Sequence, residues 1–152
     1  MINYPIDELV PHSGTMSLLD KVVDHGKDWL TAEVTINQNT LFLTNNAVPA
    51  WVGIEYMAQA IAAFAGTLAK THQQDVKLGF LLGTRKYTSS VSSFPIGTRL
   101  LIRVENELQS NDGLGVFNCS IDADNISVNA RLNVFQPKDA EQFFEQEGLK
   151  SE

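Results

Sequence analysis

Apolar residues fill almost every position of one long segment in the first half of the chain. Val48–Gly66 reads VPAWVGIEYMAQAIAAFAG, which predicts one helix of about five turns that continues to about Lys70. Glu55 is the only charge within Val48–Gly66. A helix that is apolar nearly all round must be enclosed by the rest of the protein, where an ionised carboxylate is costly unless it is paired or protonated.

Most of the remaining chain alternates between apolar and polar residues, as half-buried strands do. Four such segments are Trp29–Ile36, Thr98–Leu108, Val116–Ala123 and Ser127–Phe135. A further segment, Lys77–Leu82, is a continuous apolar run that predicts a strand buried on both faces. The residues expected to face the core are Leu30, Ala32, Val34, Ile36, Leu100, Ile102, Val104, Leu108, Phe117, Cys119, Ile121, Ala123, Val128, Ala130, Leu132 and Val134.

One buried helix followed by an antiparallel meander predicts an α+β fold of the hotdog type, in which a curved sheet wraps round a long central helix. We expect one such domain over residues 1–137. The acidic tail, residues 138–152, could form a short helix through Phe143 and Phe144. Hotdog sheets usually join edge to edge in dimers, because pairing covers exposed strand edges.

The charge balance narrows the range of partners. The net charge is −7 and basic clusters are few, so neither nucleic acid nor an acidic membrane surface is an expected partner. The sequence shows no signal-peptide pattern and no membrane-spanning run, and we expect a cytoplasmic protein. Because no nucleotide-binding or metal-binding motif occurs, no cofactor and no metal are expected.

Several motifs, taken in order along the chain, resemble one enzyme family. Pro11–Gly14 (PHSG) and Leu18–Val22 (LLDKV) are similar to the P-H-R-x-P-x-L-L-V-D-R-V opening of 3-hydroxyacyl-acyl-carrier-protein dehydratases. Glu55 followed by Ala58–Ala60 (AQA) resembles their central helix. The segments PAWVGIEYMAQAIAAFAG, GFLLGTRKY, SFPIGTRL and GLGVFNC are similar to the ApeP-like branch of aryl-polyene biosynthesis, and the resemblance covers roughly residues 8–136.

One departure from this family concerns the catalytic base. The family carries its histidine base in a G-H-F-P loop before the helix, whereas residues 43–49 of this chain read LTNNAVP. The resemblance therefore implies that Glu55 is the helix carboxylate and that the base comes from elsewhere. His12 could replace it, or it could instead fix the N-terminal turn. His25 and His72 lie in polar turns, where we expect them to be solvated.

Dehydration of a 3-hydroxyacyl thioester needs a base at the α-carbon, an acid at the 3-hydroxyl and a donor for the thioester oxygen. The amides at the helix N-terminus suit the last task. Gly53 would let an acyl chain or carbonyl approach the backbone closely. Gln59, one turn after Glu55, could hold a water or orient the carboxylate, and a purely structural hydrogen bond is the alternative.

The remaining candidates have two interpretations each. Trp51 could line an acyl tunnel or cap the core. Arg85 and Lys86 could contact an acidic carrier protein or the phosphopantetheine phosphate, although such a pair is usually only a solvated surface. Glu55 itself could bond a buried backbone group or pair with Arg85.

Three functions remain open from the sequence. The first is a dehydratase subunit that eliminates water from an acyl-carrier-protein-bound 3-hydroxyacyl substrate, with Glu55 and a partner hotdog chain's histidine completing a shared interface site. The second is a non-catalytic subunit that stabilises a partner or binds acyl carrier protein. The third is an acyl thioesterase, in which a helix carboxylate activates water. Both a homodimer and a heterodimer are compatible with the sequence.

Overall fold

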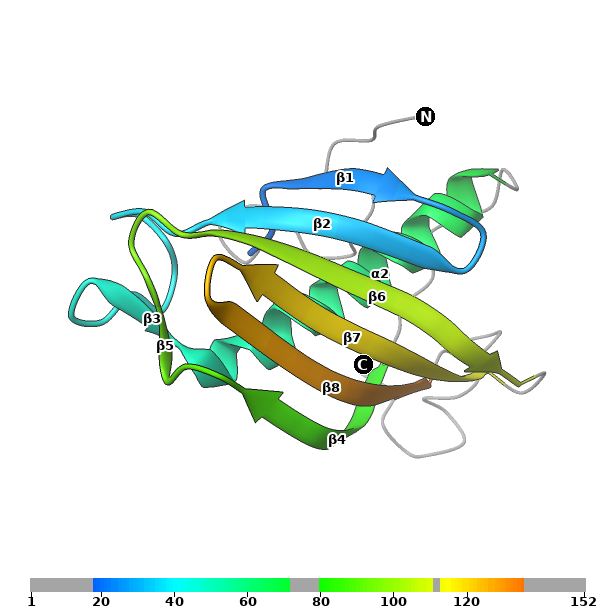
Figure 1. Ribbon diagram of the computed structural model, residues 1–152. Helices are drawn as coiled ribbons and strands as arrows, with labels where there is room; N and C mark the ends of the chain where they lie inside the picture. Colours follow the sequence, from blue (N-terminus) through cyan, green and yellow to red (C-terminus); the bar gives the residue numbers. More distant parts are fainter. Residues whose placement is uncertain (1–17, 72–79, 111–112, 136–152) are drawn as a thin grey trace, which may run out of the picture.

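A six-stranded antiparallel sheet curves over one face of a single long helix, α2 (Gly53–Thr71), in the computed structural model (Figure 1). The structure describes residues 18–71, 80–110 and 113–135. The sheet order is β1-β2-β6-β7-β8-β4, and a separate two-stranded sheet joins β3 to β5. The strands are β1 (Lys21–His25), β2 (Trp29–Thr35), β3 (Ala47–Pro49), β4 (Phe80–Ser89), β5 (Ser93–Pro95), β6 (Arg99–Gln109), β7 (Leu114–Ala123) and β8 (Ile126–Phe135).

The core lies between α2 and the inner face of the sheet. The inner residues of the strands alternate with outer ones, as the sequence predicts, and each large apolar side chain buried here contributes roughly 1.5–3 kcal/mol. The buried strand residues include Leu30, Ala32, Val34, Leu100, Ile102, Val104, Phe117, Cys119, Ile121, Val128, Ala130 and Leu132. From the helix, Tyr56, Met57, Ala60, Ala63 and Phe64 pack against them. The predicted α+β hotdog arrangement is confirmed.

Leu108 is the one predicted core residue that the structure turns to solvent. Its side chain is 56% exposed. The pairing of β6 with β7 shifts between Asn106 and Leu108, where a bulge adds one residue. Since side chains alternate along a strand, one extra residue moves the following positions to the opposite face. The alternation predicted for Leu108 is therefore wrong.

The helix begins later than its apolar pattern predicts. Residues Ala47–Pro49 form β3, in which Val48 pairs with Phe94 of β5. Ala50–Val52 then form a single 3₁₀ turn, and the α-helix starts at Gly53. Val48 and Pro49, which the apolar pattern assigns to the helix, instead pair with β5.

Strand β4 forms one edge of the six-stranded sheet and extends to Ser89. The sequence predicts a strand only over residues 77–82, of which 77–79 lie outside the described ranges. Thr84, Arg85 and Lys86 are exposed on β4, as an edge strand allows. The predicted tail from residue 138 also lies outside the described ranges.

Asparagine residues shape two of the turns. Asn45 and Asn46 both have positive φ, 53° and 65°, and connect Thr44 to Ala47, whose backbones pair. Asn125 has φ 61° in the turn between β7 and β8. Asparagine tolerates this left-handed region better than most residues with a side chain.

An ion-pair cluster covers part of the outer face of the sheet. Glu33 of β2 is 7% exposed although it points away from the helix. Lys21 lies opposite it in the ladder, with Nζ 3.0 Å from the carboxylate, and Arg99 of β6 also donates to it. Burial alone would raise the pKa of Glu33, but the hydrogen bonds and charges of Lys21 and Arg99 outweigh it and hold the pKa below its ordinary value.

Glu33→Gln should lower the free energy of unfolding at pH 7 by about 1–3 kcal/mol, because it removes the charge that both cations bind. Since the folded-state pKa is depressed, this contribution is present above the ordinary glutamate pKa of 4.5 and is lost as the pH falls through the folded value. Urea unfolding between pH 7 and pH 2 should therefore show a shallower acid slope for the variant. The exposed Glu105→Gln is the control, with a change within about 0.5 kcal/mol at pH 7. An unchanged acid slope in Glu33→Gln would contradict this account.

Candidate active site at the start of the central helix

Glu55 lies in the first turn of α2, on the side that the sheet does not cover. Its side chain is exposed, as is that of Trp51 four residues earlier, and the helix positions that follow Glu55 at intervals of three and four are partly exposed. We name this set the open stripe; its members are Trp51, Glu55, Ala58, Ala62 and Ala65. The sequence predicts full enclosure of the helix, but the chain's own sheet covers only one side. Glu55 is thus accessible to a substrate or a second chain.

An aromatic patch flanks Glu55 and consists of Leu41, Phe42 and Trp51. Trp51 is 58% exposed and Phe42 is 44% exposed, with their rings edge to face at 5.8 Å between centroids. Phe42 has φ +70°, a conformation that bulky residues rarely adopt. The alternative in which Trp51 caps the core is therefore wrong for this chain. Because Phe42 and Trp51 are exposed and in contact, they form a candidate binding surface.

The turn before the helix is held at Ala50 by bonds from two other segments. The Ala50 amide donates to the Ser92 carbonyl at 2.9 Å, and the Tyr87 hydroxyl donates to the Ala50 carbonyl at 2.5 Å. The Gly53 amide also donates to the Ala50 carbonyl. Burial raises the pKa of Tyr87 to about 12, so the phenol keeps its proton at neutral pH and remains a donor.

Gly53 is packed against side chains of this same chain. A Cβ at Gly53 would come closer than 3.0 Å to the Tyr87 hydroxyl and would meet Ile121 at 3.0 Å. The close approach of Tyr87 and Ile121 thus gives the glycine a structural reason, and a role in admitting an acyl chain stays a prediction. No pattern in the sequence indicates Tyr87, because the predicted strand ends at residue 82 and the bulge that turns Tyr87 inward depends on pairing with β8.

Gln59 is buried, at 5% exposure, one turn after the exposed Glu55. Its Oε1 accepts a hydrogen bond from the backbone amide of Leu18 at 2.8 Å. This contact joins α2 to the segment before β1 and gives Gln59 a structural role. A role in orienting Glu55 stays a prediction.

The other two sequence candidates are separate from Glu55 or outside the described ranges. His12 falls among residues 1–17, which the structure does not describe. Arg85 is exposed on edge strand β4, with its Cα opposite that of Arg131. None of the ion pairs within the described ranges joins Arg85 to Glu55, so the alternative in which Arg85 neutralises Glu55 finds no support.

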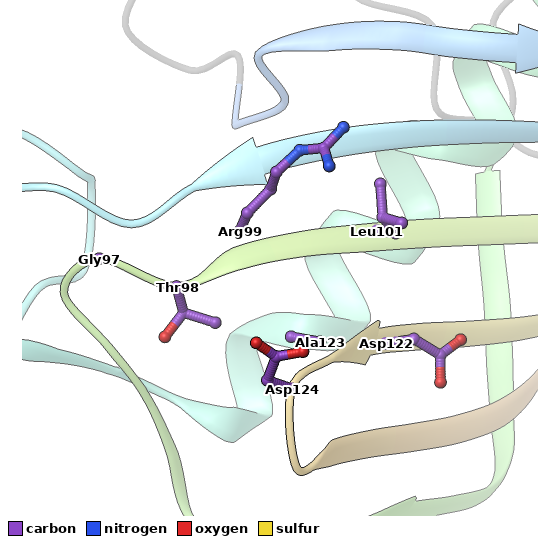
Figure 2. Close-up of a pocket in the computed structure, with 7 residues that line it drawn as sticks. All are labelled: Gly97, Thr98, Arg99, Leu101, Asp122, Ala123 and Asp124. Carbon is purple, nitrogen blue, oxygen red and sulfur yellow. The ribbon is translucent and has the colours of Figure 1, made fainter.

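An open groove of about 540 Å³ lies on the outer face of the sheet, away from α2 (Figure 2). Its lining consists of Gly97, Thr98, Arg99, Leu101, Asp122, Ala123 and Asp124. None of the candidate residues lines it, and Arg99 is already bound to Glu33. In the part of the chain that the structure describes, no cluster of three or more histidine, cysteine or acidic residues could hold a metal ion. No helix within the described ranges is long and apolar enough to cross a membrane.

The arrangement of one long helix in a curved antiparallel sheet, with a carboxylate in the first helical turn, defines a hotdog-fold protein. A family model described as ApeP dehydratase matches residues 4–145. The chain therefore belongs to the ApeP-like dehydratase family, as its motifs predict.

Solved structures agree with this assignment. One chain of a structure described as the dehydratase heterocomplex ApeI:P from Xenorhabdus doucetiae is 31% identical to this chain, with a TM-score of 0.84. The match covers 92% of this chain and 95% of that chain. A hypothetical thioesterase with coenzyme A from Streptococcus pneumoniae is 12% identical with a TM-score of 0.58, covering 76% of this chain and 86% of that chain. The PaaI protein of the Escherichia coli phenylacetic acid degradation operon is 10% identical with a TM-score of 0.56, covering 75% and 80%. The last two show the fold alone. A comparison with curated proteins finds no match.

Gln59→Leu should lower the free energy of unfolding by about 1–3 kcal/mol, because the Leu18 amide loses its acceptor. Urea unfolding of the purified chain measures the change. Ala58→Ser, on the open stripe of the same helix, is the control and should change stability by no more than about 0.5 kcal/mol. Equal stability of Gln59→Leu and the wild-type chain would contradict the structural role.

Proposed function

We propose that this chain is the carboxylate-bearing subunit of a two-chain dehydratase that eliminates water from a 3-hydroxyacyl group on acyl carrier protein. The observation that carries the proposal is the exposed Glu55 in the first turn of α2, on a stripe that the chain's own sheet leaves uncovered. Membership of the ApeP-like dehydratase family supports the reaction type. The absence of histidine from residues 43–49 supports a second chain as the source of the base.

The chemistry divides between the two chains. A partner histidine removes the proton from the α-carbon, and the electron pair forms the α,β double bond. The protonated Glu55 carboxyl gives its proton to the 3-hydroxyl, which leaves as water. Backbone amides at the start of α2 donate hydrogen bonds to the thioester oxygen and stabilise the negative charge that develops on it, as the positive end of a helix dipole also does. Return of the proton from the histidine to Glu55 resets the site.

The partner that we propose is a second hotdog chain, seated on the aromatic patch and the open stripe. Trp51 and Phe42 offer exposed aromatic surface near Glu55, and aromatic residues are enriched in the cores of interfaces. The similar ApeI:P structure is described as a dehydratase heterocomplex, which supports unlike partners. Arg85 and Lys86, exposed on β4, are proposed contacts for the acidic carrier protein or its phosphopantetheine phosphate. The proposal sets the reaction in the cytoplasm.

Glu55→Gln in the assembled complex should reduce the single-turnover rate of dehydration by about 100-fold or more, because an amide cannot supply the acid proton. The substrate is a 3-hydroxyacyl-acyl-carrier-protein, and the product is the enoyl thioester. Glu105→Gln, an exposed glutamate on β6, is the control and should turn over at the wild-type rate. The chain without its partner should show no turnover.

Each other outcome of this experiment has its own meaning. Turnover by the chain alone would indicate that His12 or another group of this polypeptide is the base. Full activity of Glu55→Gln in the complex would contradict the catalytic role of Glu55. It would indicate instead that this chain is a non-catalytic subunit that supports its partner. Release of free thiol from an acyl thioester by the purified chain would identify a thioesterase instead.

Trp51→Ser should weaken binding of the partner chain by about 30-fold, which is the loss typical of a central aromatic residue at an interface. Isothermal titration calorimetry with the purified partner measures the dissociation constant. Leu108→Ser is the matched control, because Leu108 is similarly exposed but lies on β6, away from the patch. A dissociation constant unchanged in Trp51→Ser would place the interface elsewhere.

A further inference from the structure

The start of α2 is tied directly to edge strand β4 through one side chain. Tyr87 of β4 donates its hydroxyl to the carbonyl of Ala50, and Ala50 opens the 3₁₀ turn that leads into the helix. The same carbonyl accepts the Gly53 amide. A carbonyl oxygen has two lone pairs, so Tyr87 completes the bonding of this partly enclosed group. Glu55 follows two residues after Gly53.

A bulge in β4 aims Tyr87 at the helix. The pairing of β4 with β8 shifts between Arg85 and Thr88, and Lys86 within the bulge has φ +55°. A lysine in the left-handed region is strained relative to glycine or asparagine, so the surrounding structure must hold it there. The result is that Lys86 is exposed while Tyr87, the next residue, is half-buried.

Gly53 and Tyr87 fit each other closely. A Cβ at Gly53 would come closer than 3.0 Å to the Tyr87 hydroxyl oxygen, a separation that real Cβ atoms essentially never show. The distance to the Tyr87 ring carbon that bears the hydroxyl would be 3.5 Å, which is ordinary contact. The hydroxyl is therefore the atom that most strongly opposes a larger residue at position 53, and the Ile121 side chain, at 3.0 Å, is the next nearest. This contact fixes the distance between the first turn of the helix and the edge strand.

We propose that Tyr87 is a positioning residue for Glu55. Its hydroxyl locks the Ala50–Val52 turn against β4, so the first turn of α2 has one fixed direction relative to the sheet. Through this hydrogen bond, the Glu55 carboxyl and the backbone amides of the first turn keep a fixed orientation relative to the sheet. The inference rests on the proposed function, since the alignment matters for chemistry only if Glu55 takes part in the reaction.

A double-mutant cycle tests the contact without any activity measurement. Gly53→Ala should lower the melting temperature by at least about 6 °C, and Tyr87→Phe should lower it by about 3 °C. The double variant Gly53→Ala/Tyr87→Phe should melt at a higher temperature than Gly53→Ala alone, because the clashing oxygen is gone. A double variant that melts at the temperature expected from adding the two losses would overturn the proposed lock.

Two controls accompany the cycle. Gly83→Ala should leave the melting temperature unchanged, because a Cβ there meets nothing within 4 Å. Tyr56→Phe removes a second enclosed phenol, whose pKa burial likewise raises to about 12 but whose hydroxyl has no hydrogen-bond partner among the described residues. Its melting temperature should be unchanged or raised. A loss in Tyr56→Phe equal to that in Tyr87→Phe would overturn the assignment of the effect to the bond with Ala50.

Kinetics of the assembled complex separate positioning from stability. At a temperature well below melting, Tyr87→Phe should lower kcat by about 10-fold or more and leave KM for the acyl-carrier-protein substrate within about twofold. Tyr56→Phe should keep the wild-type kcat. In a Glu55→Gln background, Tyr87→Phe should cause no further loss, because it acts through Glu55. A wild-type kcat in Tyr87→Phe, or a full additional loss in the double variant, would overturn the positioning role.

The two proposals fail in different ways. If Glu55→Gln turns over at the wild-type rate, the proposed function fails and the positioning role falls with it, whatever the melting cycle shows. If Glu55→Gln is inactive while Tyr87→Phe keeps its kcat, the proposed function stands and the positioning role alone is wrong.

Discussion

The structure depends on the burial of one side of α2 in the curve of the sheet. Every strand of the six-stranded sheet for which side chains are described contributes inward residues, and the helix meets them with Tyr56, Met57, Ala60 and Phe64. The sheet covers one side of α2 (Figure 1), and the open stripe on the other side stays exposed or partly exposed. The open stripe and the aromatic patch follow from that geometry, since the helix is apolar on both sides but has one sheet to cover it.

The second constraint is how the helix begins. The orientation of α2 relative to the sheet depends on contacts that fix its first turn. These contacts come from the β3–β5 ladder and from β4, and no side-chain cap bonds the 3₁₀ turn that precedes the helix. The β3–β5 ladder, the bond from Ala50 to Ser92 and the bond from Tyr87 to Ala50 converge within four residues of the chain. Glu55 is therefore carried by rigid backbone although its own side chain is exposed, and an exposed acid on a fixed helix is suited to completion by a second chain.

Electrostatics separates the two faces of the sheet. The outer face carries the paired charges around Glu33, where Lys21 and Arg99 neutralise a buried carboxylate and stabilise β1 and β6 against β2. The groove beside Arg99 belongs to this outer face. Glu55, on the helix side, makes no ion pair among the described residues. Glu33 thus stabilises the sheet, whereas Glu55 stays accessible, as the proposed function requires.

The sequence alone determined strands β2, β6, β7 and β8, the long helix and the resemblance to the family, because side-chain alternation, apolar runs and ordered motifs are local properties of the chain. It did not predict β1, β3 or β5. It placed Leu100, Ile102 and Val104 in the core correctly but failed at Leu108, since a bulge depends on the pairing of two strands. It singled out Glu55 but not Tyr87, because its predicted strand ended at residue 82 and the bulge that turns Tyr87 toward the helix depends on the pairing of β4 with β8. Only the tertiary structure decided which side of α2 stays open and what holds its first turn, since both depend on contacts between segments distant in the sequence.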